Sequence, residues 1–119
     1  MDPTLIVAHV KPGAEPHIAR LFEESDATEL PDLIGVRTRR LYTFHDVYIH
    51  LVEGTGEAVG PRVQAHHDHP LFQRISRALD EYVIPFQGRW GSVAQASATQ
   101  FYHWERGRGV LLRPSGGGA

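Results

Sequence analysis

Residues 36–53, VRTRRLYTFHDVYIHLVE, decide the fold, because their pattern predicts a β-hairpin. Its two arms, residues 36–44 and 47–53, are rich in β-branched and aromatic side chains, which strands favour. The short polar pair His45-Asp46 between them is placed at the turn. The hairpin therefore anchors an antiparallel sheet.

The position of the turn assigns each side chain to one face, because cross-strand partners share a face. With His45-Asp46 at the turn, Leu41 is opposite His50. The first face mixes charged, polar and aliphatic groups, which is typical of a pocket lining. It carries Arg37, Arg39, Leu41, Thr43, Tyr48, His50 and Val52. The second face is expected to be the helix-covered core. It carries Tyr42, Phe44, Val47, Ile49, Leu51 and, near its end, Arg40. A one-residue slip of the turn would exchange the two faces.

The chain before the hairpin predicts a strand and a helix. Residues 5–10, LIVAHV, are short, apolar and β-branched, as in a strand. After Pro12-Gly13, apolar residues at helical spacing predict a helix that ends near residues 25–28. Residues 29–32 are expected to form a loop, since Pro31 favours an extended shape for the residue before it.

The chain after the hairpin predicts a second helical region and a last strand. Pro61 starts a short helix, and Pro70 starts a longer one that Pro85 ends. Its apolar stripe consists of Leu71, Phe72, Ile75, Leu79, Tyr82 and Val83. Residues 86–96, with Gly88, Trp90 and Gly91, are expected to form a loop, and residues 98–104, ATQFYHW, the last strand.

The resulting order, β-α-β-β-α-β, predicts an α+β, ferredoxin-like fold with a four-stranded antiparallel sheet and helices on one face. The open face needs a cover, and a second copy packed sheet to sheet would make a dimeric α/β barrel. Residues 1–106 form the predicted domain. Residues 107–119 form a flexible tail, in which Val110, Leu111 and Leu112 are able to dock on a partner. The sequence does not decide which side chains of the first and last strands lie on the pocket face. They are Leu5, Val7 and His9 or Ile6, Ala8 and Val10 from the first strand, and Ala98, Gln100, Tyr102 and Trp104 or Thr99, Phe101 and His103 from the last.

Composition narrows the function classes. The 119 residues, 41% hydrophobic and 22% charged, suit one globular domain. The absence of cysteine excludes disulfides, thiolate nucleophiles and cysteine metal sites. A net charge of −2 gives no general attraction to nucleic acid or to an anionic membrane. With no apolar run of about 18 residues and no signal-peptide pattern at the start, we expect a cytoplasmic protein.

Two polar groupings have competing interpretations. His66-His67-Asp68-His69 suggests a metal site, but adjacent side chains point apart, and Asp68 or His69 before Pro70 is typical of a helix start. We therefore predict no metal here. Asp26, at the end of the first helix, is either a loop residue without function or overhangs the pocket face to meet Arg39 or His50. Arg39 is either an edge charge or a group that stabilises an oxyanion or enolate.

Several ordered blocks match a known family. They are SDATELP (25–31), IGVR (34–37), LYTFHDVYIHL (41–51), HPLF (69–72) and FYHW (101–104). Together they make residues 5–106 resemble the small aromatic polyketide cyclases of the tetracenomycin type, found in bacterial type II polyketide clusters. The resemblance implies a ferredoxin-like fold, a homodimer, and neither metal nor organic cofactor. It also implies a poly-β-ketone or partly cyclised aromatic substrate, closed by intramolecular aldol condensation and dehydration.

The resemblance also implies a site. The family's suspected polar pocket residues fall on Asp26, Arg39 and His50, while Ser25 stands where some relatives carry histidine. We expect His50 to remove or return the proton of a methylene between two carbonyls, and Arg39 to hold the enolate or a carbonyl oxygen. We expect Asp26 to orient His50 or to relay a proton. The expected substrate-binding residues are Arg37, Leu41, Thr43, Tyr48, Val52 and Ser25.

Two other functions suit the same scaffold. A cofactor-independent monooxygenase would oxidise similar polycyclic phenols and would need oxygen. A non-catalytic dimer would bind an aromatic compound and release it unchanged. The sequence leaves open the polyketide chain length, the ring that closes, and whether an acyl carrier protein presents the substrate.

Overall fold

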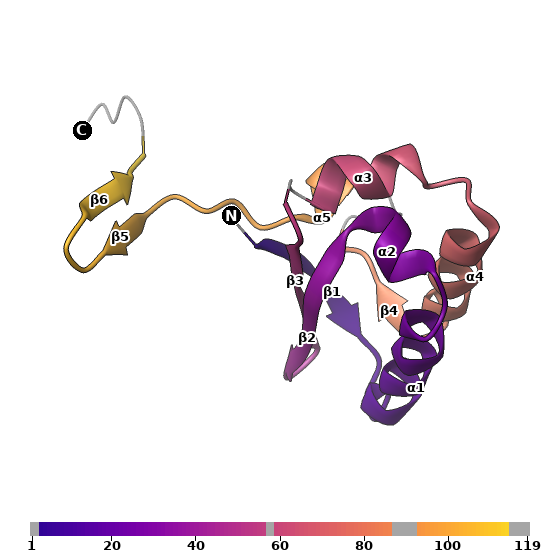
Figure 1. The fold of residues 1–119 in the computed structure, drawn as a ribbon. Coiled ribbons are helices and arrows are strands. Elements are labelled where there is room, and N and C mark those ends of the chain that lie inside the picture. Colours follow the sequence, from indigo (N-terminus) through magenta and orange to yellow (C-terminus); the bar gives the residue numbers. More distant parts are fainter. Residues whose placement is uncertain (1–2, 57–58, 87–92, 115–119) are drawn as a thin grey trace.

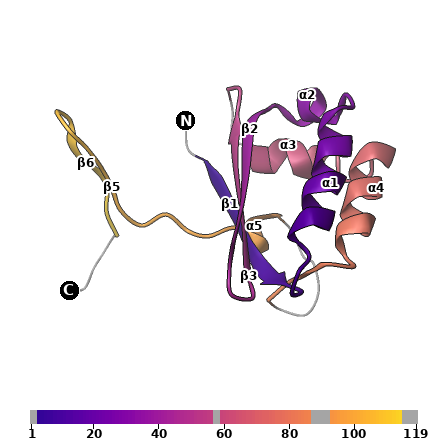
Figure 2. The ribbon, with the colours of Figure 1, turned by 90° about the horizontal axis from the view of Figure 1, so that it is seen from below.

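The computed structural model describes residues 3–56, 59–86 and 93–114. A layer of helices covers one face of a β-sheet, and a small hairpin projects from the body on an extended segment (Figures 1 and 2). In chain order the elements are β1 (Thr4–Val10), α1 (Glu15–Asp26), α2 (Leu30–Ile34), β2 (Val36–Phe44), β3 (Val47–Gly54), α3 (Val59–Ala65), α4 (Pro70–Leu79), β4 (Val83–Ile84), α5 (Val93–Ala96), β5 (His103–Glu105) and β6 (Gly109–Leu112).

The main sheet has four strands in the order β2-β3-β1-β4, and each neighbouring pair is antiparallel. This confirms the predicted α+β class and the four-stranded antiparallel sheet. The two central strands, β3 and β1, are adjacent in the sheet although two helices and β2 separate them in the chain. The helical connections between strands that are distant in the chain place α1 and α4 over the same face of the sheet, as Figure 2 shows.

The register of the hairpin is the predicted one. Leu41 pairs with His50, and Thr43 pairs with Tyr48. His45 occupies the turn with a φ of 55°, in the left-handed region that tight hairpin turns use. Pairing shifts between Val36 and Thr38, so the alternation is broken at the start of β2.

The assignment of the core face was wrong, however. Tyr48, His50 and Val52 are buried beneath the helices, whereas Tyr42 and Phe44 are 49% and 67% exposed on the opposite face. Both faces carry apolar residues, so hydrophobicity alone does not separate them. The polar face can be buried because Arg39 is paired with Asp26 of α1, and a paired charge costs far less to bury than an isolated one.

The predicted fourth strand was also wrong. Residues 98–104 do not complete the sheet; β4 does so, pairing Ile84 with His9 and Val83 with Val10. The apolar stripe of α4 was expected to continue through Tyr82 and Val83, but the helix ends at Leu79 and Val83 is buried in the sheet. Val83 is β-branched and apolar, so it fits both the end of a helical stripe and a short strand. Its pairing with Val10 in the sheet decides for the strand.

Segment 97–112 leaves the body instead of closing the sheet. Ser97 forms a single bridge to Ile6, and β5 then pairs with β6. We call residues 101–112 the arm. The boundary expected at residue 106, between the domain and its tail, lies between the two strands of the arm. Residues 109–112 of the expected tail form β6 and pair with β5.

Two expected loops contain helix. Residues 30–34 form α2, with Pro31 in its first turn. Proline is tolerated there because backbone N–H groups in the first turn have no partner within the helix. In the region 86–96, α5 occupies residues 93–96, and Gly88, Trp90 and Gly91 lie outside the described residues. At the start of α4, His69 is the cap, because its Nδ1 accepts a 3.1 Å hydrogen bond from the backbone of Leu71.

Gly35 is expected to be sensitive to substitution. It ends α2 in the left-handed conformation, with a φ of 69°, and an added Cβ would collide with the guanidinium of Arg62. Gly13 has a similar φ of 72° but open space around it. Gly13→Ala should therefore cost about 1–2 kcal/mol from backbone strain alone, and Gly35→Ala should cost at least as much, since the flexible Arg62 side chain must also move away. Urea unfolding measures both, and equal losses would show that Arg62 moves aside freely.

Candidate active site

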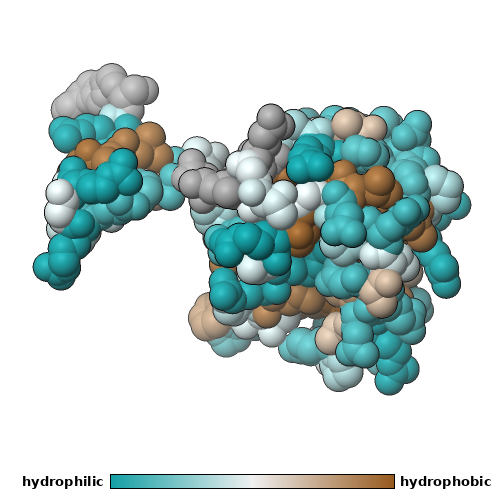
Figure 3. Space-filling model, viewed as in Figure 1, coloured by the Kyte–Doolittle hydropathy of each residue, from teal (hydrophilic) through white to brown (hydrophobic). Residues whose placement is uncertain are grey.

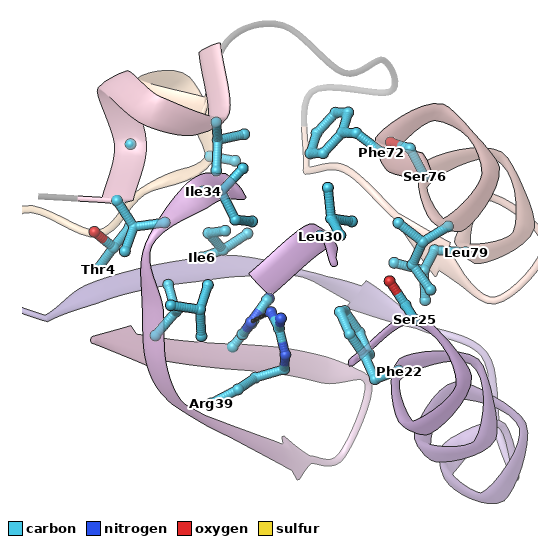
Figure 4. Close-up of a pocket in the computed structure, with 18 of the residues that line it drawn as sticks. Thr4, Ile6, Phe22, Ser25, Leu30, Ile34, Arg39, Phe72, Ser76 and Leu79 are labelled. Carbon is cyan, nitrogen blue, oxygen red and sulfur yellow. Dashed lines mark hydrogen bonds between the residues drawn. The ribbon is translucent and has the colours of Figure 1, made fainter. Parts of the chain in front are cut away.

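A cavity of 280 Å³ lies between the sheet and the helices. Figure 4 shows its apolar walls, with Phe22 from α1, Leu30 and Ile34 from α2, and Phe72 and Leu79 from α4. The hydroxyls of Ser25 on α1 and Ser76 on α4 add polar points on the helix side. On the sheet side Arg39, Tyr48 and His50 line it. A mostly apolar enclosure with a few polar groups is the usual form of a small-molecule site.

Arg39 and Asp26 form a two-point ion pair at one side of this cavity. Arg39 Nε donates to Asp26 Oδ2 at 3.0 Å, and Nη2 donates to Oδ1 at 2.6 Å. The Arg39 side chain is only 12% exposed, and Asp26, the last residue of α1, is 37% exposed. The fork of guanidinium donors matches a carboxylate, so the pair fixes the arginine in place. Asp26 therefore overhangs the pocket face and meets Arg39.

His50 receives the third bond from the same guanidinium. Arg39 Nη1 lies 2.9 Å from His50 Nε2. Because arginine can only donate, Nε2 must accept, and we assign the ring as neutral with its proton on Nδ1. Burial, and secondly the charge of Arg39, lower the pKa of His50 to about 3. His50 is thus uncharged at neutral pH and is a weak base.

Phe22 completes the setting of these polar groups. The Arg39 guanidinium carbon lies 4.7 Å from the centre of the Phe22 ring, in a cation–π contact. The same ring meets His50 edge-on, with centroids 5.1 Å apart. The pair of Arg39 and His50 is therefore held from the helix side by an aromatic side chain, which excludes water and strengthens their electrostatic interaction.

The structure separates the expected substrate-binding residues into three groups. Ser25, Tyr48 and Val52 line the cavity. Leu41 packs against the core beside it. Two others bond to side chains elsewhere. Arg37 Nη2 donates to Glu53 at 3.1 Å, and Thr43 Oγ1 donates to Glu15 at 3.1 Å.

The apolar walls from α2 and α4 were not anticipated as site residues. Phe72 and Leu79 belong to the predicted apolar stripe of α4, which indicated burial but not a cavity. Leu30 and Ile34 lie in the short helix that the sequence did not predict. Apolar spacing reveals a buried face, whereas a void requires knowledge of how the facing elements pack.

The histidine-rich segment shows no metal-binding geometry. His66 Nδ1 lies 2.9 Å from the carbonyl oxygen of Arg62, and His67 Nδ1 lies 2.8 Å from that of Gln64. Within residues 3–56, 59–86 and 93–114, no three His, Asp or Glu side chains group around a possible ion. None of the helices in these ranges has the length and apolar character that crossing a membrane requires.

Protonation of His50 should couple stability to pH. The pKa of His50 is about 3 in the folded chain and 6.5 in the unfolded chain. Between these two pH values the unfolded chain binds a proton that the folded chain does not. Stability is therefore full above pH 6.5 and falls as the pH drops toward 3, by about 1.4 kcal/mol per pH unit from this group. His50→Gln keeps an acceptor for Arg39 but removes this titration. Urea unfolding from pH 4 to 7 should show a shallower slope for the variant. Parallel curves would contradict the buried neutral histidine.

Comparisons with known proteins point to one family. The family model described as polyketide synthesis cyclase matches residues 2–105. Tetracenomycin F2 cyclase of Streptomyces glaucescens is 39% identical over 84% of this chain and 91% of its own length. Polyketide synthase CurG of Streptomyces cyaneus is 43% identical over 89% of this chain and 99% of its own length.

The fold agrees as well. The solved structure of tetracenomycin F2 cyclase, described as a type II polyketide cyclase, superposes with a TM-score of 0.79 at 36% identity. The match covers 88% of this chain and 98% of that one. An uncharacterised protein of Streptomyces coelicolor is 44% identical over 89% of this chain and 96% of its own length. By family model, sequence and fold, the chain belongs to the polyketide synthesis cyclase family.

Proposed function

We propose that this protein is a type II polyketide cyclase that closes one ring of a poly-β-ketone or partly cyclised aromatic intermediate. The observation that carries the proposal is the mostly apolar cavity with Arg39 and His50 on its sheet side, where Arg39 bonds to both His50 and Asp26. The apolar walls suit a flat, largely hydrocarbon chain, and the charged side suits its carbonyl oxygens. The names of the two polyketide relatives support the same substrate class.

The reaction is an intramolecular aldol condensation followed by dehydration. A methylene between two carbonyls loses a proton to a base and becomes an enolate. Its carbon forms a bond to a second carbonyl carbon of the same chain, and that oxygen takes up a proton. Loss of water then leaves a carbon–carbon double bond in the new ring. Negative charge develops on oxygen twice along this course, and fixed donors stabilise it best in a dry site.

Arg39 is the group that meets this charge. Asp26 and His50 fix its orientation through three hydrogen bonds, so it need not reorganise when an enolate forms. His50, expected to be the base, is better suited to holding Arg39 in place, because a ring with a pKa of about 3 removes protons poorly at neutral pH. The walls hold the reactive chain in one conformation, which brings the two carbons together.

The test is ring closure by the purified protein. The substrate is supplied by a minimal polyketide synthase, either free or on its acyl carrier protein. We expect one cyclised product formed with loss of water, at the same rate with and without oxygen. Unchanged shunt products would contradict the proposal, and a turnover that needs oxygen would identify a monooxygenase.

We also propose a homodimer that covers the open sheet face. Phe44, Tyr42 and Ile84 are exposed on that face, away from the cavity. The arm exposes more large apolar side chains, Phe101, Tyr102, Trp104, Val110, Leu111 and Leu112. Figure 3 shows an apolar patch on the arm, and Figure 1 shows it standing away from its own body. Monomers rarely expose large apolar patches, and two copies would bury these side chains by packing open face to open face with each arm on the partner.

A further inference from the structure

The polar side chains of Asp26, Arg39 and His50 already form hydrogen bonds with one another. Both carboxylate oxygens of Asp26 accept from Arg39, and Nε2 of His50 accepts from the same guanidinium. Three of the five N–H groups of Arg39 are thereby used. One N–H group remains on each terminal nitrogen of Arg39, so a second donor beside this cluster would add to what Arg39 offers a substrate oxygen.

Tyr48 offers such a donor. It lies on β3, two residues before His50 and on the same face, and the two ring centroids are 6.3 Å apart. It lines the cavity and is 97% buried, with an exposed fraction of 3%. A buried tyrosine hydroxyl usually has a hydrogen-bond partner.

The hydroxyl of Tyr48 has no such partner among the described residues. Within these residues, the side-chain oxygen that is both enclosed and unsatisfied is Thr38 Oγ1, so the Tyr48 hydroxyl keeps some accessible surface. Because the residue is otherwise buried and lines the cavity, that surface is open to a bound molecule. An unpaired buried hydroxyl is rare, and a ligand oxygen would satisfy it.

The hydroxyl acts as a donor because it keeps its proton. Burial raises the pKa of Tyr48 above its usual range, and the charge of Arg39 only partly opposes this. A neutral phenol donates to a ketone oxygen and donates more strongly to an enolate or alkoxide oxygen. The interaction therefore strengthens as the ring closes, which is the condition for lowering a barrier.

We propose that Tyr48 is a further catalytic residue, whose hydroxyl donates a hydrogen bond to the substrate oxygen that gains negative charge during ring closure. The inference rests on the proposed function and refines the general substrate-binding role expected for this residue. No bond to Tyr48 forms or breaks, and its proton stays on the phenol. Arg39 supplies positive charge, and Tyr48 supplies a directed neutral donor.

The test uses two probes that differ by one oxygen. The first, 4-nitro-1-naphthol, carries an anionic oxygen at neutral pH; the second, 1-nitronaphthalene, lacks that oxygen. Tyr48→Phe should weaken binding of the first by roughly ten- to hundredfold, the effect of a hydrogen bond to a charged acceptor, and that of the second by less than about twofold. The matched control, Tyr82→Phe, removes a hydroxyl from a tyrosine that stacks on His17 outside the cavity, and should bind both probes as wild type does.

Each other outcome overturns the proposal. Equal affinity of Tyr48→Phe and wild type for 4-nitro-1-naphthol would show that the hydroxyl does not meet an oxyanion. Equal loss for both probes would show a packing role. If Tyr48→Phe does not fold, 3-fluorotyrosine at position 48 replaces it. Its more acidic phenol should bind the anion more tightly, and unchanged binding would refute the role. Wild-type ring closure is measured alongside, and its absence would refute the proposed function instead.

Discussion

Arg39→Ala is expected to lower the yield of the correctly cyclised product by about tenfold to a hundredfold. Loss of one preorganised donor at a developing oxyanion costs about 2.7–4 kcal/mol in a dry site. The effect here should fall below that range, because a methylene between two carbonyls enolises easily and the cavity walls still fold the chain. Shunt products should rise as the correct product falls. Chromatography of the products, with circular dichroism to confirm folding, measures the effect.

Arg37→Ala is the matched control. Arg37 lies two residues earlier on the same strand and pairs with Glu53 outside the cavity. Its loss should leave the product distribution unchanged. Arg39→Lys separates charge from geometry, since lysine keeps the positive charge but cannot hold Asp26 at two points and His50 at a third. We expect an intermediate yield. Wild-type product from a folded Arg39→Ala variant would place the chemistry elsewhere.

The hairpin shows how far sequence alone predicts this fold. Alternating β-branched residues and a two-residue polar turn determined both arms and the pairing of Leu41 with His50. The same pattern could not tell which face the helices cover, because Tyr42 and Phe44 are as apolar as the true core. The burial of Arg39 depends on Asp26, 13 residues away in sequence. A local pattern does not contain that partner.

The prediction that residues 98–104 form the fourth strand of the sheet was wrong for a related reason. Residues 101–104 have strand composition, and His103 and Trp104 do lie in a strand, β5. Its partner is β6 and not β1. Composition predicts that a segment is extended, but pairing is decided by which edge is free, and β4 already occupies part of that edge of β1. A strand of two residues inside an apolar run gives almost no signal of its own.

The polar cluster of Asp26, Arg39 and His50 was predicted better than the cavity beside it. The hairpin register placed Arg39 and His50 on one face, whereas the position of Asp26 at the end of the first helix left open whether its side chain meets them. The neutral state of His50 was not foreseen, because it follows from burial and from the bond to Arg39. Lining residues such as Phe72 and Leu30 depend on the angle at which helices cross the sheet, which residue spacing does not fix.

Phe44→Glu is expected to dissociate the homodimer. The wild-type chain should sediment at about twice 13.3 kDa at micromolar concentration, because the open face and the arm both need cover. Phe44 is the most exposed large apolar residue on that face, at 67%. Its burial against a partner contributes about 1.5–3 kcal/mol, and an unpaired carboxylate in its place adds a desolvation cost. The dissociation constant should rise by at least about a hundredfold.

Ala19→Glu provides the control, since it introduces the same carboxylate at an exposed position of α1, on the helix side of the sheet and opposite the open face (Figure 2). It should leave the dimer intact. A chain that ends at residue 100 lacks the arm and tests its contribution separately. If the arm lies on the partner, this chain should be mostly monomeric, because it loses the exposed aromatic side chains of residues 101, 102 and 104. A monomeric wild type would contradict the dimer. A full-strength dimer without the arm would restrict the interface to the open face of the sheet.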